Sequence, residues 1–147
     1  MGKKTINILL ANDHILLING ISSIFEKHAP HIKIIGEAEN FIEVLNILSH
    51  KKADILMIDD IMPYGDISTL LPIVKEQHPE LKIIINSMCE NSVSHVKKTI
   101  EFVDGWVGYN SNGLEFIKAI ETVYAGGYYF INGFEKNHKV LISLNIS

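Results

Sequence analysis

The sequence predicts an α/β protein with a five-stranded parallel sheet, doubly wound so that helices cover both faces. Two observations predict this fold class. Short, nearly continuous apolar runs alternate along the chain with segments whose apolar residues recur at helical spacing. Continuous apolar runs are what strands covered on both faces require. Five strand–helix units in succession then imply parallel strands, because each crossover is right-handed and passes through a helix.

The five apolar runs are the predicted strands. The second, third and fourth are rich in isoleucine and are bounded by polar residues or glycine. The runs cover residues 6–10, 32–35, 54–58, 81–85 and 106–108.

Each strand is followed by an apolar stripe at helical spacing, which predicts a helix with one buried face. In chain order the stripes are Leu17, Ile21, Ile24 and Phe25; Phe41, Val44, Leu45 and Leu48; Ile67, Leu70, Leu71 and Val74; Val93, Val96, Ile100 and Val103; and Leu114, Ile117, Ile120 and Tyr124.

Several residues indicate where these helices begin and end. Asn40 is the expected cap of the second helix, and Asn110 or Ser111 that of the fifth. The glycines at 126–127 should stop the fifth helix. Pro72 fits the third helix only if that helix begins near Ser68, because its missing N–H would then belong to the first turn.

Composition limits the class of protein. A chain of 147 residues fits one domain, expected over residues 5–127, with 128–147 as a tail or the start of a linker. The net charge of −4 argues against this segment itself coating nucleic acid. No apolar run is long enough to span a membrane, and the start lacks the pattern of a secretory signal. With the single cysteine, Cys89, these features favour a cytoplasmic protein.

Polar residues follow the predicted strands at the edge where parallel sheets bind ligands. Asn12 and Asp13 follow the first strand, and His14 comes next. The third strand is followed by Asp59 and Asp60, the fourth by Asn86 and Ser87, and the fifth by Tyr109 and Asn110. Mg²⁺ prefers hard oxygen ligands of this kind and typically takes one or two carboxylates plus phosphate oxygens. The sequence therefore predicts an oxygen-rich pocket able to hold Mg²⁺.

Each of these residues also has a plainer interpretation. Asp13 and Asp60 could be turn or cap residues, and Ser87 could mark the entry to a helix. Asp59 is harder to explain in this way, because it ends an apolar strand and an unpaired buried carboxylate is costly. The seven histidines show no metal-ligand spacing and are expected to be solvated or locally bonded.

The combination of these features resembles the receiver domain of response regulators. The resemblance rests on Asp13, on the Asp-x-x-Met-Pro run at 59–63, on Ser87, on Trp106 and on the order of elements over residues 5–127. Two further segments are most similar to receivers of LuxR-type transcription regulators, 8–14 and 125–129.

The resemblance implies a flavodoxin-like (βα)5 fold and a role for each residue. Asp59 would attack a phosphohistidine on a sensor histidine kinase and become an aspartyl phosphate. Asp13 and Asp59, with the backbone carbonyl of Ile61, would hold Mg²⁺. Ser87 would be the switch hydroxyl that bonds the phosphoryl group, and Trp106 the switch aromatic.

Two positions depart from the family pattern. The family usually has an acidic residue at Asn12 and a lysine at Tyr109. A tyrosine hydroxyl could recover only part of a charge-assisted hydrogen bond, with a shortfall of about 1–2 kcal/mol. In the family, three carboxylates and one lysine give the pocket a formal charge of −2. Here Asp13 and Asp59 alone also give −2, so the two changes together preserve the formal charge of the pocket. Asn12 could still contact the metal through a water molecule. We therefore expect phosphorylation with weakened coupling to the switch.

The implied function is that of a phosphorelay receiver that switches an output, expected to be a DNA-binding module outside this chain. Such receivers commonly homodimerise, and no membrane contact is expected. One alternative is a pseudo-receiver that acts as a protein-interaction module without phosphorylation. Another is a Mg²⁺-dependent phosphohydrolase, but the acid/base such an enzyme needs two residues after its nucleophile is here Ile61. We expect no enzyme activity beyond self-phosphorylation and dephosphorylation.

Overall fold

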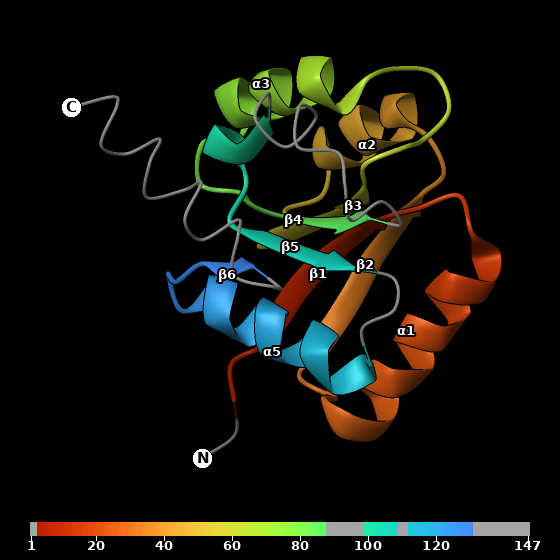
Figure 1. Cartoon of the computed structure of the whole chain (residues 1–147), viewed down its shortest axis with the longest axis vertical. Coiled ribbons are helices and arrows are strands. Elements are labelled where there is room, and N and C mark those ends of the chain that lie inside the picture. The colour runs from red at the N-terminus through yellow and green to blue at the C-terminus, as the bar shows by residue number, and fades with distance from the viewer. Residues whose placement is uncertain (1–2, 88–98, 109–111, 131–147) are drawn as a thin grey trace.

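The computed structural model describes residues 3–87, 99–108 and 112–130. It shows a parallel sheet with helices on both faces (Figure 1), which confirms the predicted fold class. The elements are β1 (Ile6–Ala11), α1 (Ile15–His28), β2 (Ile32–Ala38), α2 (Phe41–Leu48), β3 (Ile55–Asp59), α3 (Ile67–Gln77), β4 (Lys82–Ser87), the short 3₁₀ helix η1 (Ile100–Phe102), β5 (Gly105–Gly108), α5 (Gly113–Tyr124) and β6 (Tyr129–Phe130).

Within the described residues the sheet has six strands rather than the predicted five, in the order β2-β1-β3-β4-β5-β6. The additional strand β6 pairs in parallel with β5, where Gly105 lies opposite Tyr129 and Trp106 opposite Phe130. A two-residue strand is too short to show any periodicity, so only its pairing identifies it.

Two apolar clusters fill the space on either side of the sheet. One lies under α2, α3 and η1, and the other under α1 and α5. Side chains of β3 alternate between them: Leu56 and Ile58 join the first cluster, and Ile55 and Met57 the second. This alternation places Asp59, the last residue of β3, on the α1/α5 face.

The helix starts agree with the predictions only in part. Asn40 caps α2 as expected, accepting a hydrogen bond from the backbone N–H of Glu43 at 2.9 Å. Asp66 caps α3, so Pro72 lies inside the helix beyond its first turn, and the predicted start near Ser68 is one residue late. Pro72 therefore cannot supply the usual N–H to the carbonyl four residues earlier.

The cap of α5 is Asn112, whose side chain accepts from the N–H of Glu115. The predicted caps Asn110 and Ser111 lie outside the described residues. The three consecutive polar residues at 110–112 are all good caps, so sequence could not choose among them.

The buried faces of two helices are rotated from the predicted stripes. In α5, Leu114 is 64% exposed and Tyr124 38% exposed, so their assignment to the core is wrong. Their places in the core are taken by Phe116, Ala119 and Val123. In α1, Ile18 is buried, whereas Leu17 and Ile24 are only partly so.

The predicted fourth helical stripe is described only at its end. Ile100 and Val103 are buried under α3, as the stripe predicted, but Val93 and Val96 lie outside the described residues. Among the helices that the structure describes, none is long and apolar enough to cross a membrane.

Candidate functional site

The carboxyl ends of three neighbouring strands bring the predicted polar residues to one edge of the sheet. β3 lies between β1 and β4, so Asp59 has the loop after β1 on one side and the end of β4 on the other. Asn12 and Asp13 follow β1, and Ser87 ends β4. The predicted convergence of these residues is therefore observed.

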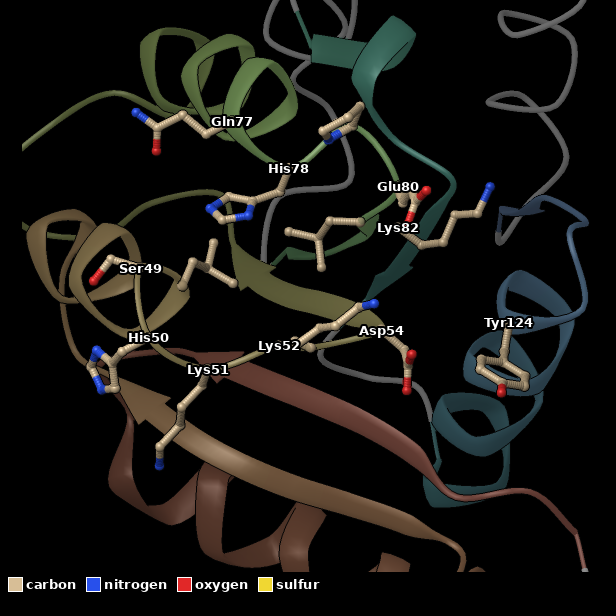
Figure 2. Close-up of a pocket in the computed structure, with 14 residues that line it drawn as sticks. Ser49, His50, Lys51, Lys52, Asp54, Gln77, His78, Glu80, Lys82 and Tyr124 are labelled. Carbon is tan, nitrogen blue, oxygen red and sulfur yellow. The ribbon is translucent and has the colours of Figure 1, made fainter.

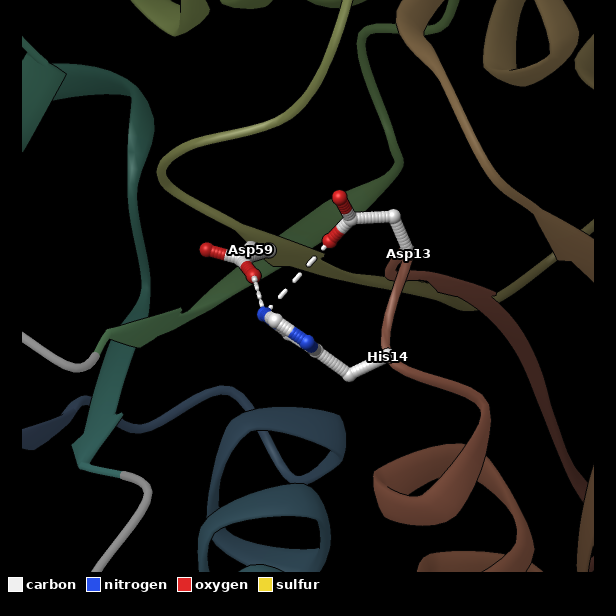
Figure 3. Close-up of side chains that lie close together, drawn as sticks. All are labelled: Asp13, His14 and Asp59. Carbon is white, nitrogen blue, oxygen red and sulfur yellow. Dashed lines mark ion pairs between the residues drawn. The ribbon is translucent and has the colours of Figure 1, made fainter.

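Asp13, His14 and Asp59 form the centre of the site. The Nε2 atom of His14 lies 3.6 Å from Asp13 Oδ1 and 3.9 Å from Asp59 Oδ2, between the two carboxylates (Figure 3). One ligand atom from each residue lies within 4.8 Å of the others, a spacing that could hold a metal ion. The two carboxylates fit the oxygen preference of Mg²⁺.

Asp59 is held in a defined orientation by its own loop. Its side chain is 4% exposed, and Oδ1 accepts a hydrogen bond from the backbone N–H of Ile61 at 2.9 Å. The second oxygen, Oδ2, is the one directed at His14. A buried carboxylate with one oxygen fixed and the other facing a cation site suits a nucleophile.

Asn12 shapes the loop after β1. It is fully buried, and its Oδ1 accepts a hydrogen bond from the backbone N–H of His14 at 2.8 Å. Its backbone N–H donates to the carbonyl of Ala38 in β2. Asn12 therefore positions Asp13 and His14, and its contact with a metal through water stays a prediction.

Asp60 is more than the turn or cap residue that the sequence allowed. It is 4% exposed and accepts a hydrogen bond from the hydroxyl of Ser87 at 2.9 Å. The backbone N–H of Asp60 also donates to the carbonyl of Asn86. Ser87 thus contacts the carboxylate next to Asp59, and the two side chains tie the ends of β3 and β4 together.

Asp60 also changes the electrostatics of the site. With Asp13, Asp59 and Asp60 ionised and His14 neutral, the described part of the site carries a formal charge of −3, one more negative than the two predicted carboxylates alone. A more negative pocket attracts divalent cations more strongly and repels an uncompensated phosphate.

The structure describes only one of the two predicted site residues at the fifth strand, Trp106 and Tyr109. Trp106 is 5% exposed and packs in the cluster under α2 and α3, with Ile85 and Phe130 as its strand partners. Tyr109 lies outside the described residues. That the backbone carbonyl of Ile61 binds the metal stays a prediction.

Two residues that the sequence places at strand ends, without a role in the site, also belong to it. His14 was expected to be solvated or locally bonded, yet it lies against Asp59; its place directly after Asp13 was the only signal. Asn86 is 1% exposed, and neither its Oδ1 nor its Nδ2 has a hydrogen-bond partner among the described residues. An unpaired buried amide costs about 1–3 kcal/mol, so its presence beside the site calls for an explanation.

A separate cavity of about 660 Å³ lies at the opposite edge of the sheet, near the amino ends of β3 and β4 (Figure 2). Lys51, Asp54, His78 and Tyr124 are among its lining residues. Since parallel sheets of this class bind ligands at the carboxyl ends of their strands, this cavity is no part of the site around Asp59.

Comparison with known proteins decides the family. The family model of the response regulator receiver domain matches residues 8–107, a segment that contains Asp13, Asp59, Ser87 and Trp106.

The chain belongs to the response-regulator receiver family. The transcriptional regulatory protein RcsB of Salmonella typhi is 34% identical over 91 residues, covering 60% of this chain and 42% of that protein. The oxygen regulatory protein NreC of Staphylococcus epidermidis is 27% identical over 125 residues, covering 83% of this chain and 56% of that protein. The chain thus spans about half the length of the curated relatives it matches.

Solved receiver domains have the same fold. The non-phosphorylated receiver of RcsB from Escherichia coli superimposes with a TM-score of 0.79 at 26% identity, over 86% of this chain and 98% of that one. The isolated RcsB receiver from Salmonella enterica serovar Typhimurium, with the phosphomimetic BeF3⁻, gives 0.78 at 26% identity, over 88% and 95%. The predicted resemblance to receivers of LuxR-type regulators is confirmed.

Proposed function

We propose that this receiver accepts a phosphoryl group on Asp59 from a phosphohistidine of a sensor histidine kinase and thereby switches an output. The observation that carries the proposal is the geometry of Asp59. It is buried at the end of a central strand, its Oδ1 is fixed by the Ile61 N–H, and its Oδ2 faces Asp13 and His14.

The proposed transfer requires little rearrangement of Asp59. Its Oδ2 attacks phosphorus, the new O–P bond forms as the P–N bond to histidine breaks, and the departing nitrogen keeps the electron pair and takes a proton. The Ile61 N–H holds the other carboxylate oxygen during the attack. Asp13 and Asp59, with the Ile61 carbonyl and with Asn12 through water, would hold Mg²⁺. When bound, Mg²⁺ supplies positive charge to offset the carboxylates and the phosphoryl oxygens.

The output step involves Ser87 and Trp106. In the structure the Ser87 hydroxyl donates to Asp60, so bonding the phosphoryl group requires that hydroxyl to leave Asp60 or to share its contact. We propose that this exchange, followed by Trp106, is how the phosphoryl group alters the surface of the domain.

The relatives suggest what that output is. One solved structure is described as two RcsB dimers bound to two parallel DNAs. For this protein we propose a cytoplasmic homodimer that reaches DNA only through an output module outside residues 1–147, without contact with a membrane.

Incubation with acetyl phosphate and Mg²⁺, followed by a phosphate-affinity gel, tests the function. The unchanged chain should give a shifted band that disappears in the Asp59→Asn variant and without Mg²⁺. Replacing the neighbouring carboxylate, Asp60→Asn, should leave a band. A shifted band that persists in Asp59→Asn would refute the assignment.

The pseudo-receiver is the second candidate, and the Ser87–Asp60 contact favours it because the switch hydroxyl is already engaged. Under that hypothesis the gel shows no shifted band under any condition. A receiver retains its phosphoryl group and releases little phosphate, whereas steady release over many turnovers would indicate a phosphohydrolase.

A further inference from the structure

Asn86 is a buried polar side chain beside Asp59 that takes no part in the proposed transfer to Asp59. It is 1% exposed, and both polar atoms of its amide lack a hydrogen-bond partner within the described part of the chain. Nearly all buried polar side chains in proteins are paired, and an exception requires a specific explanation.

The register of the sheet places Asn86 next to Asp59. The Cα atoms of the two residues are partners in the β3–β4 ladder, and neighbouring strands lie about 4.8 Å apart. Paired residues of adjacent strands share a face, and Ile84, two residues earlier on β4, belongs to the α1/α5 cluster, as do Ile55 and Met57 of β3. Asn86 and Asp59 therefore extend toward the same face.

Different kinds of side chain lie on the two sides of Asp59, toward β1 and toward β4. On the β1 side lie the carboxylate of Asp13 and the imidazole of His14. On the β4 side, the hydroxyl of Ser87 is engaged with Asp60. Asn86 is thus the side chain of β4 on the same face as Asp59 at the end of the strand.

We propose, building on the proposed phosphorylation of Asp59, that the Asn86 amide is a phosphoryl-binding group. Its Nδ2 donates a hydrogen bond to an oxygen of the phosphoryl group on Asp59. Because neither amide atom is held by a described partner, the amide can turn its donor toward the incoming oxygens without breaking another bond. It would supply part of the donation that a lysine at Tyr109 would otherwise give.

Beryllofluoride titration with Mg²⁺, followed by NMR, tests the proposal in the full chain. The side-chain amide signals of Asn86, assigned by their loss in Asn86→Leu, should shift when beryllofluoride binds the unchanged chain. Asn86→Leu should weaken beryllofluoride binding roughly tenfold, as loss of a hydrogen bond to a charged group does.

Thermal unfolding distinguishes a loss of beryllofluoride affinity from a loss of stability. Asn86→Leu removes an unpaired buried amide, so its Tm should equal or exceed that of the unchanged chain while its affinity falls. Ile84→Val, on the same strand and face, is the matched control and should lower Tm without changing the affinity.

The outcomes distinguish this proposal from the function on which it rests. Equal affinities of the unchanged chain and Asn86→Leu, or unshifted Asn86 amide signals at saturation, would overturn the role of Asn86 alone. Absence of binding by the unchanged chain would overturn both the role of Asn86 and the phosphorylation of Asp59.

Discussion

The hydrogen bond between Ser87 and Asp60 contributes to stability because it is buried. Both residues are almost completely buried, and their hydrogen bond joins the ends of two central strands. A hydrogen bond to a buried charged group contributes more than one between neutral groups, and removing its donor leaves the carboxylate short of a partner. The stability of the fold therefore depends on whether the Ser87 hydroxyl is bonded to Asp60.

Replacing Ser87 by alanine should lower the free energy of unfolding by about 1–3 kcal/mol, because Asp60 loses a buried donor. Urea unfolding measures this change. Ser23→Ala, at an exposed position of α1, is the control and should stay within about 0.5 kcal/mol of the unchanged chain. If both serine variants unfold at the same urea concentration, the Ser87–Asp60 contact does not contribute to stability.

Two glycines, Gly65 before α3 and Gly20 within α1, differ in whether their surroundings leave room for a side chain. Gly65 has φ +152°, and a Cβ there would lie 2.5 Å from Phe41 of α2. It stands directly before Asp66, the cap of α3. Gly20, within α1, is exposed, and a Cβ added there would have no other atom within 4 Å. The same substitution should therefore have opposite effects at the two positions.

Gly65→Ala should destabilise the protein by about 1–3 kcal/mol, from strain and from displacement of the Phe41 ring. Gly20→Ala should stabilise it by about 0.5–1 kcal/mol, because alanine is the better helix former. Thermal unfolding of the two variants, side by side, measures the difference. Destabilisation by Gly20→Ala, or none by Gly65→Ala, would contradict the described packing.

The short strand β6 pairs with β5 and also contacts α5 through a side chain. The hydroxyl of Tyr129 donates a hydrogen bond to a carboxylate oxygen of Glu115. Burial, followed by this bond and by the negative charge of Glu115, raises the pKa of Tyr129 to about 12. In the unfolded chain the pKa of a tyrosine is about 10.

The raised pKa means that folding favours the neutral phenol. Its contribution to stability is fully present below about pH 10 and is lost as the pH rises through about 12. Tyr129→Phe should therefore reduce stability below that window, and its deficit relative to the unchanged chain should shrink inside it. Denaturant unfolding across this pH range provides the measurement, and a deficit that grew with pH would contradict the assignment.

For the molecule as a whole, the sequence predicted the architecture and the edge of the sheet where the candidate residues meet, because both follow from local patterns. Continuous apolar runs identified the central strands, and helical stripes between them required a core on each face of the sheet. Parallel topology then required Asp13, Asp59 and Ser87 to meet at one edge.

The features that sequence missed depend on tertiary contacts. β6 exists through its pairing with β5, and the buried face of α5 is rotated so that Leu114 and Tyr124 are exposed. Asp60 and Asn86 are polar residues whose burial no periodicity could reveal, since Asp and Asn are common turn residues. The site differs most from the prediction at residues whose role depends on their burial rather than on their residue type.

Peptide mass mapping of the unchanged chain, after incubation with acetyl phosphate, tests the central claim most directly. Asp13, Asp59 and Asp60 lie close enough that only the mapped position tells them apart. We predict a phosphoryl group on Asp59, formed only when Mg²⁺ is present. A phosphoryl group on Asp13 or Asp60, or no modification of any of the three, would contradict it.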